Sequence, residues 1–272
     1  MTLGTSEVVA AALAEDLGDR GDITSELLVP ADAVATARVV ARRPGVLAGR
    51  AAAEEVLRQT GVAGAWRLDD GARLEPGSVV CEITGPARAV LTAERTLLNL
   101  LCHLSGVATL TAAYAEAASP AAVLDTRKTT PGLRALEKAA VVAGGGVNHR
   151  MGLHDRVLVK DNHLALAGAG LVDAVARARR ELPGVLVEVE ADDLAGVHHA
   201  LDAGADWILL DNMSTDELRE AVAAVAGRAK LEASGGMALE GARAAGATGV
   251  DAISVGALTH SAPALDLGLD ID

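Results

Sequence analysis

The stretch 125–163 concentrates charged donors in a chain whose net charge is -13. It holds seven of the 24 lysines and arginines and three of the seven histidines, against four acids. The cations are Arg127, Lys128, Arg134, Lys138, Arg150, Arg156 and Lys160, and the histidines are His149, His154 and His163. Arginine and lysine give directed, charged hydrogen bonds to carboxylate and phosphate. This cationic patch beside glycine-rich turns therefore predicts a site for small multivalent anions.

Polar residues also follow a series of apolar, β-rich runs in the second half of the chain. The run ends carry Asp125, Arg127 and Lys128; Lys160; Glu188 and Glu190; Asp211 and Asn212; Glu232 and Ser234; and Ser254 and Gly256. In β/α barrels, catalytic groups cluster where the strands end at their C-terminal face. One such coincidence carries little weight, because polar residues often end strands. Six consecutive runs that end in polar residues favour a functional site at the C-terminal rim of the barrel.

The run ends offer two kinds of side chain. One kind is cationic and suits a substrate with more than one carboxylate. It comprises Arg127, His149, Arg150 and Lys160. The other kind, Glu190 and Asp211, offers the hard oxygen ligands that Mg²⁺ prefers. Glu188 shares a strand face with Glu190, which leaves open which of the two is the main metal ligand.

Glycine-rich segments follow the last two runs, at 234–236 and 255–257. Backbone N–H groups in such segments can hold a phosphate. A single Ser-Gly-Gly is weak evidence, but barrels often build a phosphate site at the ends of their last two strands. The two segments together predict a phosphate site.

The elements that must position these residues alternate regularly after Pro120. Short β-rich runs and amphipathic helical patterns follow one another from AVLDT through LRALEKAAVVAG, RVLVK, LVDAVARARREL, VLVEVE, DLAGVHHALDAG, WILLD, TDELREAVAAVAG, KLEAS and LEGARAAGAT to DAISVG. Such alternation is the pattern of consecutive right-handed βα units. Six strands can be counted, so the sequence predicts an incomplete, TIM-like β/α barrel with fewer than eight strands.

The first part of the chain has a different pattern. It predicts helices at 6–17 and 50–60, strands within 35–49, 65–68 and 78–84, and a helix from about residue 89 that breaks near Ser105 and Gly106. These elements indicate an α+β open sandwich with a mostly antiparallel sheet. The predicted domains are 1–115 and 116–272, and the last residues are candidates for packing back on the first domain.

Composition narrows the function classes. The acidic balance and the 1% of aromatic residues argue against a nucleic-acid groove. The uncharged run 96–115 has membrane-span length, but its polar residues favour a buried helix of a soluble protein. The N-terminus lacks a basic region, so no signal peptide is expected. Cys81 and Cys102 have no metal-site spacing, which favours free thiols and a cytoplasmic location.

Seven motifs together resemble the quinolinate phosphoribosyltransferase family, also called carboxylating nicotinate-nucleotide diphosphorylase. They are ALAEDLGDRGDITS, AERTLLNLLCHLSGVAT, the stretch 125–163, VEVE, LLDN, EASGG and ISVGALTHSAPALDLGLDI. The motifs are long, ordered and spread over nearly the whole chain. Departures from the family pattern, such as Val107 and Met237 in place of Ile, are conservative.

The resemblance implies a reaction and a set of site residues. The family joins quinolinate to 5-phosphoribosyl-1-pyrophosphate in NAD biosynthesis, releasing pyrophosphate and CO₂ to leave nicotinate mononucleotide. By this resemblance, Arg127, His149, Arg150 and Lys160 bind the two carboxylates, with Arg95 from the other subunit of a homodimer or higher homo-oligomer. Lys128 reaches the donor phosphates, and Glu190 and Asp211 bind Mg²⁺ and the ribose. Glu232, Ser234, Gly235 and Gly256 line the phosphoribosyl site, and Lys128, Lys160, Glu190 and Asp211 form the catalytic set.

Other interpretations stay open at this point. Lys160 could be the Schiff-base lysine of an aldolase, and the barrel could be a non-catalytic phosphosugar or dicarboxylate sensor. A related transferase of the kind found with molybdate transport resembles much of the chain. Several residues also have purely structural explanations: solvated charges for Arg134, Lys138 and Arg156, a satisfied helix residue for His103, surface positions for His198 and His199, and core packing for Trp207.

Overall fold

The computed structural model describes residues 4–168 and 170–271, which form two compact units. The first unit comprises the described residues up to Ala112, Thr129–Gly145 and the residues from Leu258 onward, and the second comprises Ala113–Lys128 and Gly146–Ala257. The division predicted between residues 115 and 116 falls inside helix α4 (Ala87–Ala118). Each unit is therefore assembled from segments that are distant in the sequence.

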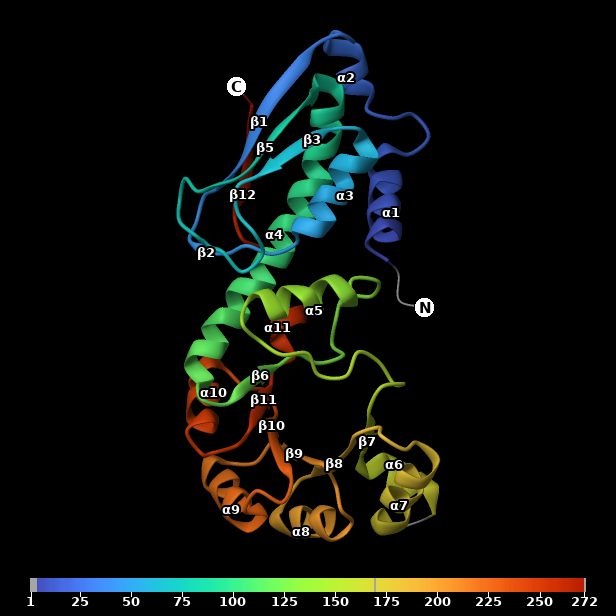
Figure 1. Ribbon diagram of the computed structural model, residues 1–272, viewed down its shortest axis with the longest axis vertical. Helices are drawn as coiled ribbons and strands as arrows, with labels where there is room; N and C mark the ends of the chain where they lie inside the picture. The colour runs from blue at the N-terminus through green and yellow to red at the C-terminus, as the bar shows by residue number, and fades with distance from the viewer. Residues whose placement is uncertain (1–3, 169, 272) are drawn as a thin grey trace. The chain divides into compact units, whose positions relative to one another are not determined.

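The first unit contains the antiparallel sheet that the sequence predicts. Its strand order is β12-β1-β5-β3, with β12 (Leu267–Ile271), β1 (Val34–Ala41), β5 (Val79–Pro86) and β3 (Ala63–Trp66). Helices α1 (Thr5–Leu17), α3 (Arg50–Thr60) and α4 lie on one side of this sheet (Figure 1). Strand β12 pairs with β1 in a register that places Leu269 opposite Val39. The C-terminal strand thus closes one edge of the N-terminal sheet.

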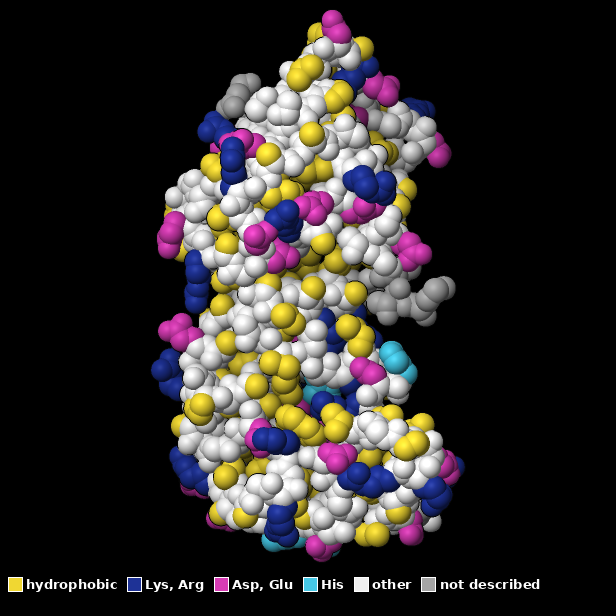
Figure 2. All heavy atoms as spheres, viewed as in Figure 1, with side chains coloured by type: hydrophobic (Ala, Val, Ile, Leu, Met, Phe, Trp, Pro, Cys, Tyr) yellow, Lys and Arg dark blue, Asp and Glu magenta, His cyan; other side chains and the backbone are white. Residues whose placement is uncertain are grey.

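The first unit also contains several smaller elements. They are α2 (Ile23–Leu28), the two-stranded ribbon of β2 (Gly45–Val46) and β4 (Arg73–Leu74), α5 (Arg134–Ala143) and α11 (Ala257–His260). Asp22 caps α2 by accepting a 2.9 Å hydrogen bond from the N–H of Ser25. Figure 2 shows yellow apolar side chains at the top of the view, over α2, where Leu27 and Leu28 are 82% and 71% exposed. This short helix therefore presents an apolar surface.

The predicted break in the long helix near residue 105 is wrong, because α4 is continuous over 32 residues. The Ser105 hydroxyl accepts a 3.0 Å hydrogen bond from the N–H of Ala48 and lies 3.2 Å from its carbonyl. At Gly106, an added Cβ would lie 2.2 Å from the carbonyl oxygen of Pro263. Both residues thus allow other segments to approach the helix closely. By length and apolar composition α4 could also cross a membrane, but 61% of its apolar window is buried, as in a core helix.

The second unit contains all six predicted strands in one parallel sheet, with the order β6-β11-β10-β9-β8-β7. The strands are β6 (Ala122–Leu124), β7 (Val157–Val159), β8 (Val187–Ala191), β9 (Trp207–Asp211), β10 (Lys230–Ser234) and β11 (Ala252–Ser254). Val147 adds an isolated parallel bridge to Leu124 at the β6 edge. The expectation of fewer than eight strands is therefore confirmed.

Helices surround this sheet in the manner of a β/α barrel. They are α6 (Asp161–Ala167), α7 (Leu171–Glu181), α8 (Leu194–Asp202), α9 (Thr215–Val225) and α10 (Leu239–Gly246). Figure 1 shows α7 to α10 in an arc outside the strands. Apolar residues such as Val197 and Leu218 line the buried faces of these helices. The sheet thus has a covered outer face and an inner face that is free to carry polar side chains.

One predicted barrel helix, α5, lies in the first unit instead. Its Glu137 and Lys138 are fully buried, so the interpretation of Lys138 as a solvated charge is wrong. Glu137 accepts hydrogen bonds from the N–H of Thr130 at 3.0 Å and pairs with His103 at 2.9 Å. This pairing confirms His103 as a satisfied helix residue. The amphipathic pattern of α5 correctly predicts a helix, but the spacing of its apolar residues does not determine which unit its apolar face covers.

Candidate active site

The parallel register brings the predicted rim residues to one edge of the second unit. Lys160 directly follows β7, while Asp211 and Ser234 are the last residues of β9 and β10 and lie opposite each other. Glu190 and Glu232 both lie beside Leu209, in neighbouring strands. Because parallel strands end at the same edge, these side chains share one end of the sheet.

Three carboxylates gather at this edge. One oxygen from each of Glu190, Asp192 and Asp211 lies within 4.8 Å of the other two. Lys160 forms an ion pair with Glu190, whose side chain is 12% exposed. Oxygen donors in this number suit Mg²⁺, which binds through one or two carboxylates and keeps other positions for waters and substrate phosphates. These residues therefore fit the metal that the sequence predicts.

Asp192 was missed by reasoning from the sequence. It follows β8 directly and is exposed, so it looks like an ordinary loop acid. The one feature of the sequence that points to Asp192 as a metal ligand is its position just beyond a predicted strand, two residues after Glu190. Proximity to Asp211, a residue of the next strand, becomes visible only in three dimensions.

A glycine turn interlocks the ends of β9 and β10. Gly235 has a φ of +121°, and an added Cβ would lie 2.4 Å from Oδ1 of Asn212. The Asn212 N–H donates to the carbonyl of Ser234 at 2.9 Å, and its side-chain amide donates to Asp211 at 2.9 Å. Glycine is needed at this position because other residues rarely adopt this conformation and because the space is occupied. The Ser-Gly-Gly segment therefore supports the orientation of Asp211.

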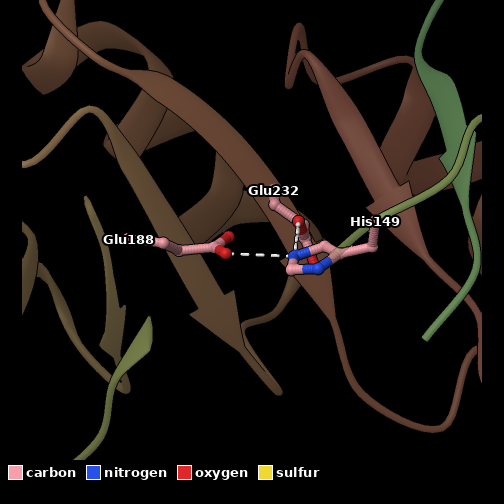
Figure 3. A group of neighbouring side chains, drawn as sticks. All are labelled: His149, Glu188 and Glu232. Carbon is pink, nitrogen blue, oxygen red and sulfur yellow. Dashed lines mark ion pairs between the residues drawn. The ribbon is translucent and has the colours of Figure 1, made fainter. Parts of the chain in front are cut away.

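Beside this edge lies a buried cluster of His149, Glu188 and Glu232 (Figure 3). Glu188 comes from β8 and Glu232 from β10, and both point toward Nε2 of His149, at 3.0 and 3.2 Å. The His149 side chain is 7% exposed and the carboxylates are 0% and 1% exposed. The backbone N–H of His149 donates to the buried Asp125 at 2.9 Å. His149 is thus fixed at both its backbone and its ring.

Two opposing influences act on the protonation of His149. Burial lowers its pKa, but hydrogen bonds to Glu188 and Glu232 outweigh burial and raise the pKa to about 9. Nδ1, however, lies 2.7 Å from the N–H of Arg150 and accepts its hydrogen bond. This contact fixes the orientation of the ring, and Nε2 lies among the two carboxylates and Nη1 of Arg156, which is 3.2 Å away.

The carboxylates of the cluster differ from each other. Burial raises the pKa of Glu232, which favours the neutral acid. Burial acts in the same direction on Glu188, but His149 and Arg156 reverse its effect and lower the pKa of that carboxyl. The pKa values of the two carboxyls beside His149 are therefore shifted in opposite directions.

The cations selected from the sequence lie in both units. In the second unit, burial and the nearby charge of Arg127 lower the pKa of Arg150, which shows that these two guanidinium groups interact. Arg127 and Lys128 are exposed, and the Lys160 side chain is 41% exposed. Arg95 belongs to the first unit, on α4, with a side chain that is 64% exposed. Gly256 lies two residues beyond β11, at the end of the barrel sheet.

The remaining candidates have structural explanations. His163 accepts a 3.0 Å hydrogen bond from the N–H of Lys160 at the start of α6. His198 and His199 are exposed on α8, as expected. Arg156 is the exception, because its side chain is only 13% exposed and pairs with Glu188, so the solvated-charge interpretation is wrong for it. Cys81 and Cys102 are free thiols.

Comparisons with known proteins agree along the whole chain. The quinolinate phosphoribosyl transferase N-terminal domain matches residues 22–105, and the C-terminal domain of the same family matches residues 107–270. A nicotinate-nucleotide pyrophosphorylase (carboxylating) from Mycobacterium leprae is 46% identical over 97% of this chain and 96% of its own length. The solved nicotinate-nucleotide pyrophosphorylase of Francisella tularensis is 38% identical, with a TM-score of 0.93, over 98% of this chain and 96% of that one. The corresponding structure from Ehrlichia chaffeensis is 36% identical over the full length of both chains, with a TM-score of 0.93.

Proposed function

Since this chain belongs to the quinolinate phosphoribosyltransferase family, we propose that it transfers the phosphoribosyl group of 5-phosphoribosyl-1-pyrophosphate to quinolinate. The products are nicotinate mononucleotide, pyrophosphate and CO₂, and the reaction is a step of NAD biosynthesis. One observation carries this proposal: a cation and a cluster of carboxylates lie together at one strand-end edge, where Lys160 pairs with Glu190 beside Asp211.

Quinolinate is held by the cationic side chains of the second unit. The charge of Arg127 lowers the pKa of Arg150, although Glu188 and Asp155 act in the opposite direction, so the two guanidinium groups repel each other. A dicarboxylate relieves this repulsion and accepts charged hydrogen bonds from both guanidinium groups. Lys160 completes the set of groups for the two carboxylates, and His149, whose ring nitrogens are engaged by Arg150, Glu188 and Glu232, supports Arg150. The site is thus prepared for a substrate with two negative groups.

The phosphoribosyl donor is held by the acids and glycines of the same edge. Glu190 and Asp211, with Asp192 beside them, would hold Mg²⁺, which supplies charge neutralisation for the diphosphate leaving group. Ser234, Gly235 and Gly256 offer backbone N–H groups to the 5-phosphate. Lys128 reaches the phosphates of the donor. Glu232, at the level of Glu190 in the sheet, lies against His149 and supports this floor of the site.

The reaction needs no nucleophile from the protein. The ring nitrogen of quinolinate forms a bond to the anomeric carbon, and the bond from that carbon to the diphosphate oxygen breaks. The side chains contribute by holding two anions in line against their mutual repulsion. Carboxylates near the ribose stabilise the positive charge that develops there, and Lys128 stabilises the negative charge on the leaving group.

Decarboxylation follows from the product of the first step. The alkylated ring nitrogen is cationic, so it stabilises the electron pair left on the adjacent carbon when the carbon–carboxylate bond breaks. CO₂ leaves, and the carbon takes a proton. The cationic pocket around the leaving carboxylate motivates this step on the protein, and release of a dicarboxylated mononucleotide would refute it.

The active protein is a cytoplasmic homodimer or a higher homo-oligomer. Arg95 from one subunit joins the quinolinate site of another. The exposure of the Arg95 side chain in the first unit supports this assignment. Arg95 forms an ion pair with Glu94 at 3.7 Å. An arginine with so little engagement in its own chain is free to bind an anion across an interface.

The proposal is tested by offering two acceptors separately. Purified protein with Mg²⁺ and phosphoribosyl pyrophosphate receives quinolinate in one reaction and nicotinate in the other, and mononucleotide and pyrophosphate are followed. Turnover of quinolinate alone supports the proposal. Turnover of neither acceptor, with both ligands still bound, contradicts it and favours a sister transferase or a sensor.

A further inference from the structure

The glycine-rich loop 235–238, between β10 and α10, is hydrogen-bonded to the long helix α4. The phenolic hydroxyl of Tyr114, the one tyrosine of the chain, donates a 3.0 Å hydrogen bond to the carbonyl oxygen of Met237. Tyr114 lies in the last turns of α4, and its residue surface is only 6% exposed. A buried side chain from a segment distant in the sequence therefore holds the middle of this loop.

A second contact keeps α10 against the end of α4. Gly246 is the last residue of α10, and an added Cβ there would lie 2.1 Å from the carbonyl oxygen of Ala118, the last residue of α4. Figure 1 shows α10 beside this end of α4. Tyr114, Ala118 and the whole of α10 belong to the second unit. The end of α4 is thus a fixed support both for α10 and for the loop that precedes it.

The hydrogen bond from Tyr114 sets the direction of one peptide group. In a planar trans peptide the C=O and N–H groups point in opposite directions. Because the carbonyl of Met237 points to Tyr114, the N–H of Ala238 in the same peptide points away from α4. A flip of this peptide would replace a hydrogen-bond donor by a carbonyl oxygen, which repels an anion. The hydroxyl of Tyr114 therefore stabilises the orientation that offers a donor.

The loop also leaves space and donors for a phosphate. An added Cβ at Gly236 would meet no atom of the described residues within 4 Å, and both Gly236 and Ala238 are exposed. Ala238 is the N-cap of α10, and alanine has no side-chain acceptor for the N–H groups of the first turn. Backbone N–H groups in this position can bind a phosphate. What the loop needs for this purpose is a fixed direction of its peptide groups.

From these contacts we propose that Tyr114 is a positioning residue for the 5-phosphate of the phosphoribosyl donor. Its hydroxyl holds the peptide between Met237 and Ala238, so that the donors of the loop are oriented before the ligand binds. Tyr114 acts through the loop and does not touch the ligand. The inference rests on the proposed function, because it takes the loop as the phosphate site of that reaction.

The test removes the hydroxyl alone, in Tyr114→Phe, and measures steady-state kinetics and thermal unfolding. The loss of one neutral hydrogen bond corresponds to an about two- to tenfold change in affinity. We therefore expect the KM for phosphoribosyl pyrophosphate to rise about two- to tenfold and the KM for quinolinate to change less than about twofold.

Thr248→Val is the matched control. The hydroxyl of Thr248 is also buried and donates a 2.6 Å hydrogen bond to a backbone carbonyl, that of Ala245, in the same unit. It lies beyond the C-terminal end of α10, whereas the loop lies before the N-terminal end. Thr248→Val should lower the melting temperature and leave both KM values within about twofold of those of the unsubstituted protein.

Calorimetric binding of three ligands, each measured separately, shows which phosphate is affected. Phosphoribosyl pyrophosphate and ribose 5-phosphate carry the 5-phosphate, whereas pyrophosphate represents the leaving group alone. In Tyr114→Phe the Kd should rise about two- to tenfold for the first two ligands and stay within about twofold for pyrophosphate with Mg²⁺. Equal rises for all three ligands, an unchanged Kd for ribose 5-phosphate, or the same changes in Thr248→Val would overturn the inference.

The inference and the proposed function fail in different ways. An unsubstituted protein that binds phosphoribosyl pyrophosphate but turns over no quinolinate overturns the proposed function, and the binding of ribose 5-phosphate still decides the role of Tyr114. An unsubstituted protein that turns over quinolinate but binds no ribose 5-phosphate, or binds it as tightly as Tyr114→Phe does, overturns the inference alone.

Discussion

Replacement of Gly235 by alanine tests how the turn between β10 and α10 supports the metal-binding edge. The substitution forces a side chain onto a backbone with a φ of +121° and brings its Cβ to 2.4 Å from Oδ1 of Asn212. That oxygen belongs to a short side chain whose amide also binds Asp211 at 2.9 Å. Asn212 must therefore move, and its hydrogen bond to Asp211 is broken.

The magnitude follows from these two effects. An alanine held at a left-handed φ costs roughly 1–2 kcal/mol relative to glycine, and the lost hydrogen bond costs about 0.5–1.5 kcal/mol. We expect the free energy of unfolding of Gly235→Ala to fall by about 1.5–3.5 kcal/mol. If the about 0.5–1.5 kcal/mol of the lost hydrogen bond weakens binding of the phosphoribosyl donor, the KM for phosphoribosyl pyrophosphate rises about two- to tenfold. The KM for quinolinate should stay within about twofold, because the hydrogen bond that is lost belongs to Asp211, on the side of the site that holds the donor.

Chemical unfolding and steady-state kinetics on two variants provide the measurement. Gly227→Ala is the matched control, because Gly227 also has a positive φ, +75°, but nothing lies within 4 Å of its added Cβ. It should lose about 1 kcal/mol of stability and keep both KM values. If Gly235→Ala has an unchanged KM for the phosphoribosyl donor, or if the two variants behave alike, the supporting function assigned to the turn is refuted.

Three further changes probe other parts of the chain. Asp22→Ala should lower the free energy of unfolding by about 1 kcal/mol, and Asp22→Asn much less, because both Asp and Asn cap helices. Hydrogen bonds from Ser25 lower the pKa of Asp22 below its ordinary 3.8. The stabilisation by its charge is therefore present above that pH and is lost as the pH falls through the folded pKa. Unfolding measured from pH 7 to 3 should show the difference in stability between the unsubstituted protein and Asp22→Ala becoming smaller. Gly106→Ala, whose Cβ meets a backbone oxygen at 2.2 Å, should cost about 1–3 kcal/mol or more in thermal unfolding. Chelation of divalent metal should abolish turnover, and Mg²⁺ should restore it. Asp192→Asn should raise the Mg²⁺ concentration needed for half-maximal rate by several-fold. An unchanged Mg²⁺ concentration would contradict the assignment of Asp192 to the metal.

Most elements of the barrel could be predicted because each strand leaves a local pattern. A β-rich apolar run followed by an amphipathic helix needs no knowledge of the rest of the chain, and all six runs became neighbouring strands. Helix α5 has an equally clear pattern, yet it lies in the first unit. Local periodicity identifies the element and its apolar face, whereas the partner of that face is decided by packing between segments distant in sequence.

The long helix illustrates a second limit. Ser105 and Gly106 are poor helix formers, and from propensity alone a break between them is the better prediction. A weak propensity of about 1 kcal/mol is outweighed once Ser105 binds the backbone of Ala48 and Gly106 admits the carbonyl of Pro263. The same two residues that weaken an isolated helix are those that let this one pack.

The acids of β8 show why site residues are harder to assign than strands. Glu188 and Glu190 have the same type and the same strand face, and nothing in the run VEVE separates them. In the structure, Glu190 lies at the strand end, where it meets Lys160 and two other carboxylates. Glu188 lies one step deeper, fully buried against His149 and Arg156. A step of two residues along a strand, about 6.6 Å, separates an acid suited to a hydrated metal from one that needs a buried cation. The surroundings of each acid therefore decide its chemistry, and these surroundings come from the neighbouring strands and loops.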